Sequence, residues 1–95
     1  EINMRRTTLT IVNPLGLHAR AASKLVDVAK NFAANITLTS DSGVEADAKR
    51  IMSLLLLGAP VDSQVALSVE GEEEDDAFDA LTALIRAGFY ELDES

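Results

Sequence analysis

Hydrophobic positions alternate with period two in some stretches of the chain and recur every three or four residues in others. The period-two stretches predict strands, because successive side chains of a strand point to opposite faces of a sheet. In the first of them we expect Leu9 and Ile11 to face inward. Four such strands are predicted, over residues 6–12, 36–40, 44–46 and 64–70.

Three stretches have helical spacing, and the first and the last of them each carry one apolar stripe of the kind that a surface helix buries. We expect Asp47 to cap the second helix, because an aspartate side chain accepts hydrogen bonds from free N–H groups at a helix start. Gly58 should end that helix, and Gly88 should follow the third, since glycine readily adopts the left-handed conformation. The predicted helices cover about residues 18–32, 48–57 and 72–87.

The resulting order is β-α-β-β-α-β-α. Short connections and a central hairpin favour an α+β fold: an open-faced β-sandwich in which a four-stranded antiparallel sheet is covered on one face by three helices. Residues 1–95 are expected to form a single domain. Because Met4 is internal, residues 1–5 are interpreted as a flexible extension or a cloning remnant.

The second helix has more apolar side chains than one buried face can hold. Ser53 is the one polar residue between Ile51 and Leu57. Either some of these side chains are exposed and form a contact surface, or the last residues leave the helix and bury in a loop.

Net charge and composition narrow the possible partners. The chain has a net charge of −8, which argues against nucleic acid or an anionic membrane as the main partner. Cysteine is absent, so no Cys-based metal site is predicted, and we expect no metal. The longest apolar run is too short to span a bilayer, and no signal-peptide pattern is present. These features lead us to expect a cytoplasmic protein without membrane insertion.

The single histidine, His18, stands where the turn-rich residues 13–16 give way to the first helix. Free backbone N–H groups at a helix start, here those of Ala19, Arg20 and Ala21, can donate to the oxygens of a phosphoryl group. Arg20 adds a permanent, forked cation. The competing interpretation is a histidine that only caps the helix or packs in the core.

Two stretches carry a family resemblance. Gly16-Leu17-His18-Ala19-Arg20, continued by residues 21–26, resembles the active-site motif of HPr, the histidine-containing phosphocarrier of the bacterial phosphotransferase system. The second signature of that family resembles residues 49–59, which begin with Lys49-Arg50-Ile51-Met52 and end with Leu57-Gly58-Ala59. The resemblance implies that His18 accepts a phosphoryl group on Nδ1 from phosphorylated enzyme I. His18 would then pass the group to an EIIA-type protein, as a cofactor-free monomeric carrier and not as an enzyme.

The resemblance also implies a partner-binding surface beside the histidine. In the family, basic positions surround an apolar patch on the second helix, which would account for its surplus of apolar residues. The positions carried over are Lys30, Lys49, Arg50, Ile51, Met52 and Leu55.

Two residues depart from the family pattern. Ala21 stands where the family usually has proline, and we expect the helix to persist because alanine is a strong helix former. Arg50 stands where many members carry a regulatory serine, so that regulation is expected to be absent. Ser53 is nearby but does not align with that serine.

Several functional alternatives stay open. Val44–Ala48, Glu73–Glu74 and Ala87–Phe89 look like the nitrogen-related carriers of the family, which we favour over a sugar-uptake HPr. A binding module of the same fold that transfers nothing is a further alternative. An acylphosphatase-like hydrolase would need a phosphate cradle, and no Gly-rich loop is apparent.

Overall fold

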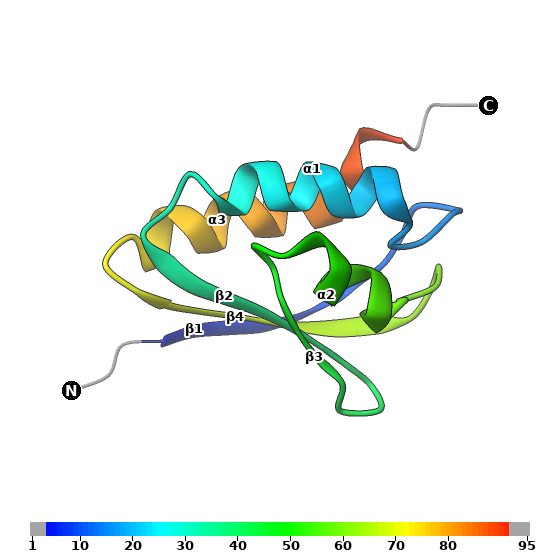
Figure 1. The fold of residues 1–95 in the computed structure, drawn as a ribbon, viewed down its shortest axis with the longest axis horizontal. Helices are drawn as coiled ribbons and strands as arrows, with labels where there is room; N and C mark the ends of the chain where they lie inside the picture. Colours follow the sequence, from blue (N-terminus) through cyan, green and yellow to red (C-terminus); the bar gives the residue numbers. More distant parts are fainter. Residues whose placement is uncertain (1–3, 92–95) are drawn as a thin grey trace.

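The computed structural model describes residues 4–91, and the order of its elements confirms the predicted β-α-β-β-α-β-α arrangement (Figure 1). A short 3₁₀ turn, η1, follows the last helix. The elements are β1 (Met4–Thr10), α1 (Ala19–Ala29), β2 (Ala34–Ser40), β3 (Glu45–Asp47), α2 (Ile51–Leu57), β4 (Gln64–Gly71), α3 (Glu74–Arg86) and η1 (Gly88–Tyr90).

The four strands form one sheet in the order β1-β4-β2-β3, and every pairing is antiparallel. The last strand in the sequence, β4, therefore lies between the first two. Leu9 pairs with Val65 and Leu38 with Leu67, and all four side chains are buried. The period-two pattern thus selected the inward face correctly, as the alternation of side chains across a strand requires.

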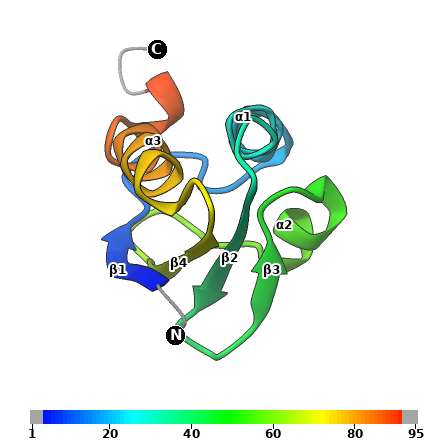
Figure 2. The same cartoon turned by 90° about the vertical axis from the view of Figure 1, so that its left-hand side faces the viewer.

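All three helices lie on the same face of the sheet (Figure 2). Helices α1 and α3 contact each other, α3 lies over β1 and β4, and α2 packs beside β3 and α1. The core fills the space between these helices and the inward side chains of the strands. The predicted open-faced sandwich is therefore confirmed.

The chain start departs from the prediction. Met4 and Arg5 belong to β1, where they pair with Glu70 and Val69. The guanidinium of Arg5 also donates to Asp75 at 2.7 Å. The extension predicted over residues 1–5 is thus wrong for residues 4 and 5, because both are tied into the sheet. Residues 1–3 lie outside the described part of the chain.

The start of α2 also departs from the prediction. Asp47 is the last residue of β3, where it pairs with Thr37, so the chain needs several residues to leave the sheet before it can turn into a helix. The carboxylate of Asp47 accepts from the N–H of Lys49 at 2.9 Å, and Arg50 occupies the N-cap position without a side-chain bond. Gly58 ends α2 in the left-handed conformation, as predicted.

The apolar surplus of α2 lies within the helix. Leu54 and Leu57 are buried, whereas Ile51, Met52 and Leu56 are 39, 64 and 79% exposed. The alternative in which the last residues leave the helix is therefore wrong. An exposed apolar face remains, and such faces commonly bind partners.

Helix α1 ends earlier than predicted, whereas the C-terminal end of α3 follows the prediction. Helix α1 stops at Ala29, and Phe32 packs half-buried in the following turn. Helix α3 ends at Arg86 with Ala87 as its C-cap, and Gly88 follows in the left-handed conformation at φ 62°, as predicted. Gly88 also opens η1, which turns the chain back toward the start of α1.

Candidate functional site

The loop between β1 and α1 is held by hydrogen bonds within itself and to the loop after α2. Buried Asn13 donates its side-chain N–H to the Gly16 carbonyl at 2.7 Å, and the Gly16 N–H donates to the Asn13 carbonyl at 3.0 Å. Gly16 has φ +67°, and a Cβ there would lie 2.6 Å from the Ala59 carbonyl oxygen. Only glycine fits this position without displacing backbone. The Leu17 N–H then donates to the same Ala59 oxygen at 2.8 Å.

This loop delivers His18 to the N-cap position of α1. Its backbone is extended, and its Nδ1 accepts a hydrogen bond from the Arg20 N–H at 3.2 Å. The side chain of His18 remains 25% exposed. His18 therefore does cap the helix, as the competing interpretation held, but it is not a core residue and its ring reaches the surface.

A buried carboxylate, that of Glu91, lies beside the ring, and sequence reasoning missed it. The His18 Nε2 lies 2.9 Å from both carboxylate oxygens of Glu91. Asn13 and Arg20 donate to the same group at 3.1 and 3.3 Å. Glu91 lies 73 residues after His18 in an irregular segment, outside any periodic pattern. The one hint in the sequence is Phe89, two residues before Glu91. A large apolar side chain at that position indicates that the C-terminal segment packs back onto the core.

The carboxylate of Glu91 is kept ionised by its neighbours. Burial alone would raise its pKa, but the hydrogen bonds from His18 and Asn13, the charge of His18 and the hydrogen bond from Arg20 together lower the pKa below its ordinary value. The result is a fixed negative charge under the imidazole.

Lys24 belongs to this site as well. Its Nζ donates to the Phe89 carbonyl at 2.8 Å and lies 4.0 Å from the Glu91 carboxylate. In the structure its ammonium faces the C-terminal segment.

The three backbone groups predicted to hold a phosphoryl group are not equivalent. Ala19 and Arg20 are exposed, and the Arg20 N–H is the group that contacts Nδ1 of His18. Ala21 is 0% exposed, so its N–H does not reach the surface in this conformation. Helix α1 nevertheless begins at Ala19, which shows that alanine at position 21 sustains the helix.

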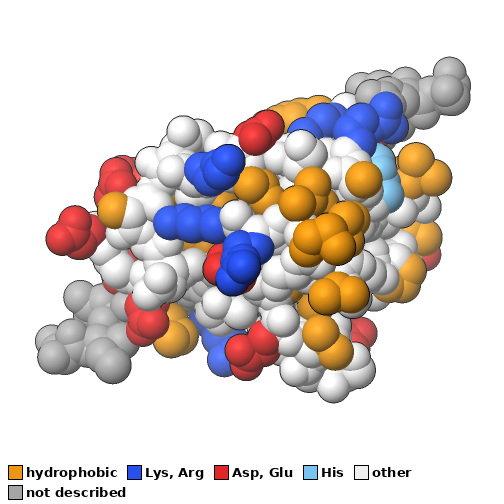
Figure 3. Space-filling model, viewed as in Figure 1, with side chains coloured by type: hydrophobic (Ala, Val, Ile, Leu, Met, Phe, Trp, Pro, Cys, Tyr) orange, Lys and Arg blue, Asp and Glu red, His pale blue; other side chains and the backbone are white. Residues whose placement is uncertain are grey.

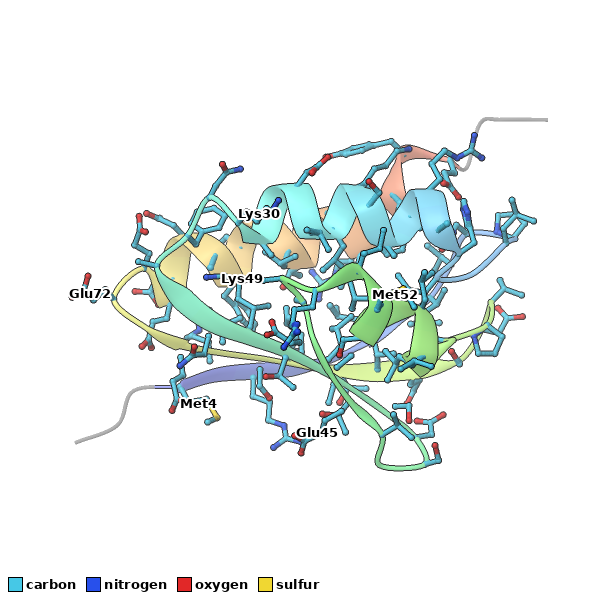
Figure 4. The ribbon with its side chains drawn as sticks, viewed as in Figure 1. Met4, Lys30, Glu45, Lys49, Met52 and Glu72 are labelled. Atoms are coloured by element: carbon cyan, nitrogen blue, oxygen red, sulfur yellow. The ribbon has the colours of Figure 1, made fainter. Side chains whose placement is uncertain are left out.

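The predicted partner-binding residues lie on α2 and around the end of α1. Apolar side chains gather over α2, with Lys and Arg side chains beside them (Figure 3). Lys30 is exposed, whereas Lys49 is half-buried and donates its Nζ to the Phe32 carbonyl at 2.7 Å (Figure 4). Met52 is well exposed and Leu55 is partly buried against the core.

The described residues offer neither a cluster of metal ligands nor a membrane-spanning helix. Among residues 4–91, no group of three or more His, Asp or Glu side chains is placed to hold a metal ion. The described helices include none that is long and apolar enough to cross a membrane.

A four-stranded open-faced sandwich that presents a capping histidine and an arginine at the start of a helix defines a class of small α+β proteins with a histidine-centred site. A family model described as PTS-HPr, "PTS HPr component phosphorylation site", matches residues 5–87. The chain therefore belongs to the HPr family of phosphocarriers of the bacterial phosphotransferase system.

Named relatives support this assignment at nearly full length. The chain is 44% identical over 88 residues to the phosphocarrier protein HPr of Cupriavidus necator, covering 93% of this chain and 98% of that protein. It is 37% identical over 86 residues to the phosphocarrier protein NPr of Escherichia coli, covering 90% and 96%. The crystal structure of an HPr from Thermoanaerobacter tengcongensis superposes with a TM-score of 0.85 at 37% identity, covering 90% and 96%.

Proposed function

We propose that His18 accepts a phosphoryl group on Nδ1 from phosphorylated enzyme I and passes it to an EIIA-type protein. The observation that carries the proposal is the position of Nδ1, which faces the Arg20 N–H at the start of α1 on a ring that remains accessible. A helix start favours a bound anion by about 0.3–1 kcal/mol, and by up to about 2 kcal/mol when partly buried.

The guanidinium of Arg20 is the cation suited to the transferring group. It is 55% exposed and within 3.3 Å of Glu91, so it lies at the mouth of the site. Arginine forms forked, charge-assisted hydrogen bonds with phosphoryl oxygens. A carrier must also release its cargo, and a shallow site with few donors suits release better than a closed pocket. The phosphoryl-contacting backbone groups proposed are those of Ala19 and Arg20, and of Ala21 if the first turn opens.

The exposed face of α2 supports the proposal that the carrier docks on partner proteins. Ile51 and Met52 offer apolar surface, and Leu55 supports them from below. Lys30 and Arg50 can attract acidic partners, because charges at the rim of an interface raise the association rate. We propose a monomeric, cytoplasmic carrier that docks through this face and needs no cofactor.

For the acceptor we propose the nitrogen-related branch, on the segments Val44–Ala48, Glu73–Glu74 and Ala87–Phe89. The specific observation in favour of the other branch is the 44% identity to the Cupriavidus necator protein, which carries the name HPr. A sugar-uptake HPr is therefore the second candidate.

The test is incubation of the full chain with phosphoenolpyruvate and enzyme I, followed by intact-mass measurement. Wild type should gain one acid-labile phosphate, and His18→Ala should gain none while keeping its circular-dichroism spectrum. Absence of phosphate on both would contradict transfer and would favour a binding module. Addition of a nitrogen-type or a sugar-type EIIA to the phosphorylated carrier then distinguishes the branches by which acceptor removes the phosphate.

A further inference from the structure

The segment after α3 follows a strained path to reach the site. Gly88, Phe89 and Tyr90 have φ values of 62°, 56° and 61°, so three consecutive residues are left-handed. This conformation costs a residue with a side chain about 1–2 kcal/mol. Buried Phe89 and the bond from Lys24 to its carbonyl hold the segment in place beside the start of α1 (Figure 1). The residue delivered by this path is Glu91.

The two ring nitrogens of His18 have partners of opposite kind. Nδ1 faces a donor, the Arg20 N–H, and Nε2 faces acceptors, the two oxygens of Glu91. With its proton on Nδ1, the ring would place two N–H donors against each other at Arg20. It would also place the lone pair of Nε2 against the carboxylate, and neither contact would be a hydrogen bond. A proton on Nε2 with a free lone pair on Nδ1 satisfies both contacts.

The carboxylate of Glu91 is itself fixed in position. Asn13 donates to one of its oxygens, and Asn13 is held in turn by the Gly16 carbonyl. Arg20 donates to the other oxygen, and Lys24 lies 4.0 Å from it. A buried carboxylate with this set of donors has a defined orientation, as do the groups that orient metal-bound or catalytic histidines.

We propose that Glu91 is a positioning residue for phosphoryl transfer: it holds the proton of His18 on Nε2 and so keeps the Nδ1 lone pair available. This inference rests on the proposed function of His18. In the transfer step the Nδ1 lone pair forms a bond to phosphorus. The bond between phosphorus and the nitrogen of the donor phosphohistidine breaks, and its electron pair stays with the donor. The Nε2 proton does not move, and the negative carboxylate stabilises the positive charge that develops on the ring.

Onward delivery reverses this step. The bond between Nδ1 and phosphorus breaks, its electron pair returns to Nδ1, and phosphorus binds a nitrogen of the acceptor histidine. Because the ring then loses its positive charge, the carboxylate matters in both directions. Arg20 contacts Glu91 and also lies at the mouth of the site, so a phosphoryl group on Nδ1 should draw the guanidinium away from Glu91.

The test compares wild type with Glu91→Gln, which keeps the size of the side chain and removes its charge. We expect the maximal rate of phosphoryl transfer from enzyme I to fall about tenfold, by analogy with other groups that orient a functional histidine. The KM for the carrier should not change, because docking uses α2. Glu91→Asp should restore part of the rate. Glu72→Gln, an equal change of charge at an exposed position, should transfer like wild type.

A second readout reports on the ring itself. In ¹⁵N NMR of the unphosphorylated full chain, His18 should show a proton on Nε2 that exchanges slowly in wild type and several-fold faster in Glu91→Gln. Two outcomes in Glu91→Gln would overturn the positioning role. One is slower phosphoryl transfer with unchanged exchange of the Nε2 proton, and the other is faster exchange of that proton with an unchanged transfer rate. Phosphorylation of wild type with equal rates in both proteins would overturn this inference alone. Failure of wild type to take up phosphate would overturn the proposed function with it.

Discussion

The His18 site and the exposed face of α2 lie near each other but are built in different ways. The site combines three stretches that are distant in the sequence: the loop with Asn13 and Gly16, the Ala59 carbonyl, and the C-terminal segment with Glu91. The α2 face comes from one seven-residue helix whose apolar side chains exceed what the core can bury.

In our proposal, this difference separates phosphoryl transfer at His18 from partner binding at α2. A change in the His18 site alters contacts that also hold loops together, so it should affect transfer and stability at once. A change on the outer face of α2 removes surface that nothing in residues 4–91 covers, so it should affect docking alone. Four comparisons of variants test this separation, from the largest expected effect to the smallest.

Gly16→Ala should produce the largest effect. The new Cβ would meet the Ala59 oxygen at 2.6 Å and would also sit at positive φ. We expect the free energy of unfolding to fall by about 2–4 kcal/mol, the sum of left-handed strain and overpacking, as measured by urea denaturation. Gly43→Ala is the matched control, because φ there is +89° and nothing lies within 4 Å of the added Cβ. Its cost should be about 1 kcal/mol, and equal losses for the two variants would contradict the loop contact.

Met52→Asp should weaken docking on enzyme I by roughly 10- to 30-fold without changing the stability of the fold, because a charge replaces an exposed apolar side chain at the proposed contact. Titration calorimetry with enzyme I measures the affinity. Met4→Asp makes the same change on the exposed side of β1, away from α2 (Figure 4). If both variants bind like wild type, docking through α2 is wrong.

Glu91→Gln should change how stability depends on pH. The pKa of Glu91 is lowered in the folded state, so the unfolded chain binds more protons and stability rises with pH in that range. The contribution is complete above the ordinary value of 4.5 and is lost as the pH falls through the lowered folded-state value. Denaturation at a series of pH values should show wild type losing this increment in acid. A constant difference between wild type and variant from pH 6 down to about pH 3 would contradict it.

The smallest effects separate two lysines that the family resemblance treats alike (Figure 4). Lys49→Met should lower the free energy of unfolding by about 1 kcal/mol, because the bond to the Phe32 carbonyl is lost. Lys30→Met should leave stability within about 0.5 kcal/mol, because Lys30 is exposed. Both variants should associate more slowly with an acidic partner at low salt, as stopped-flow measurements would show. Equal stability of the two would remove the structural role of Lys49.

Local pattern was sufficient for most of the fold. The inward positions Leu9, Ile11 and Val65 followed from alternation alone. Gly58 ends α2 as predicted, because glycine adopts the left-handed conformation without strain. Prediction failed where a residue had two possible local roles. Asp47 is a good cap in isolation, but its pairing with Thr37 keeps it in the sheet. Gly88 follows α3 in the left-handed conformation, as predicted, but no local pattern showed that it also opens the turn that returns the chain to the site.

The sequence by itself determined the order of the elements, the surplus of apolar residues in α2 and the candidates His18 and Arg20, because periodicity, turn residues and motif are local properties. The tertiary structure decided which groups surround the imidazole. Glu91, Asn13 and Lys24 carry no local signal for that role, and they reach His18 because loop closure and the burial of Phe89 bring distant segments together. The carboxylate that orients the ring in our proposal is therefore a product of the fold as a whole.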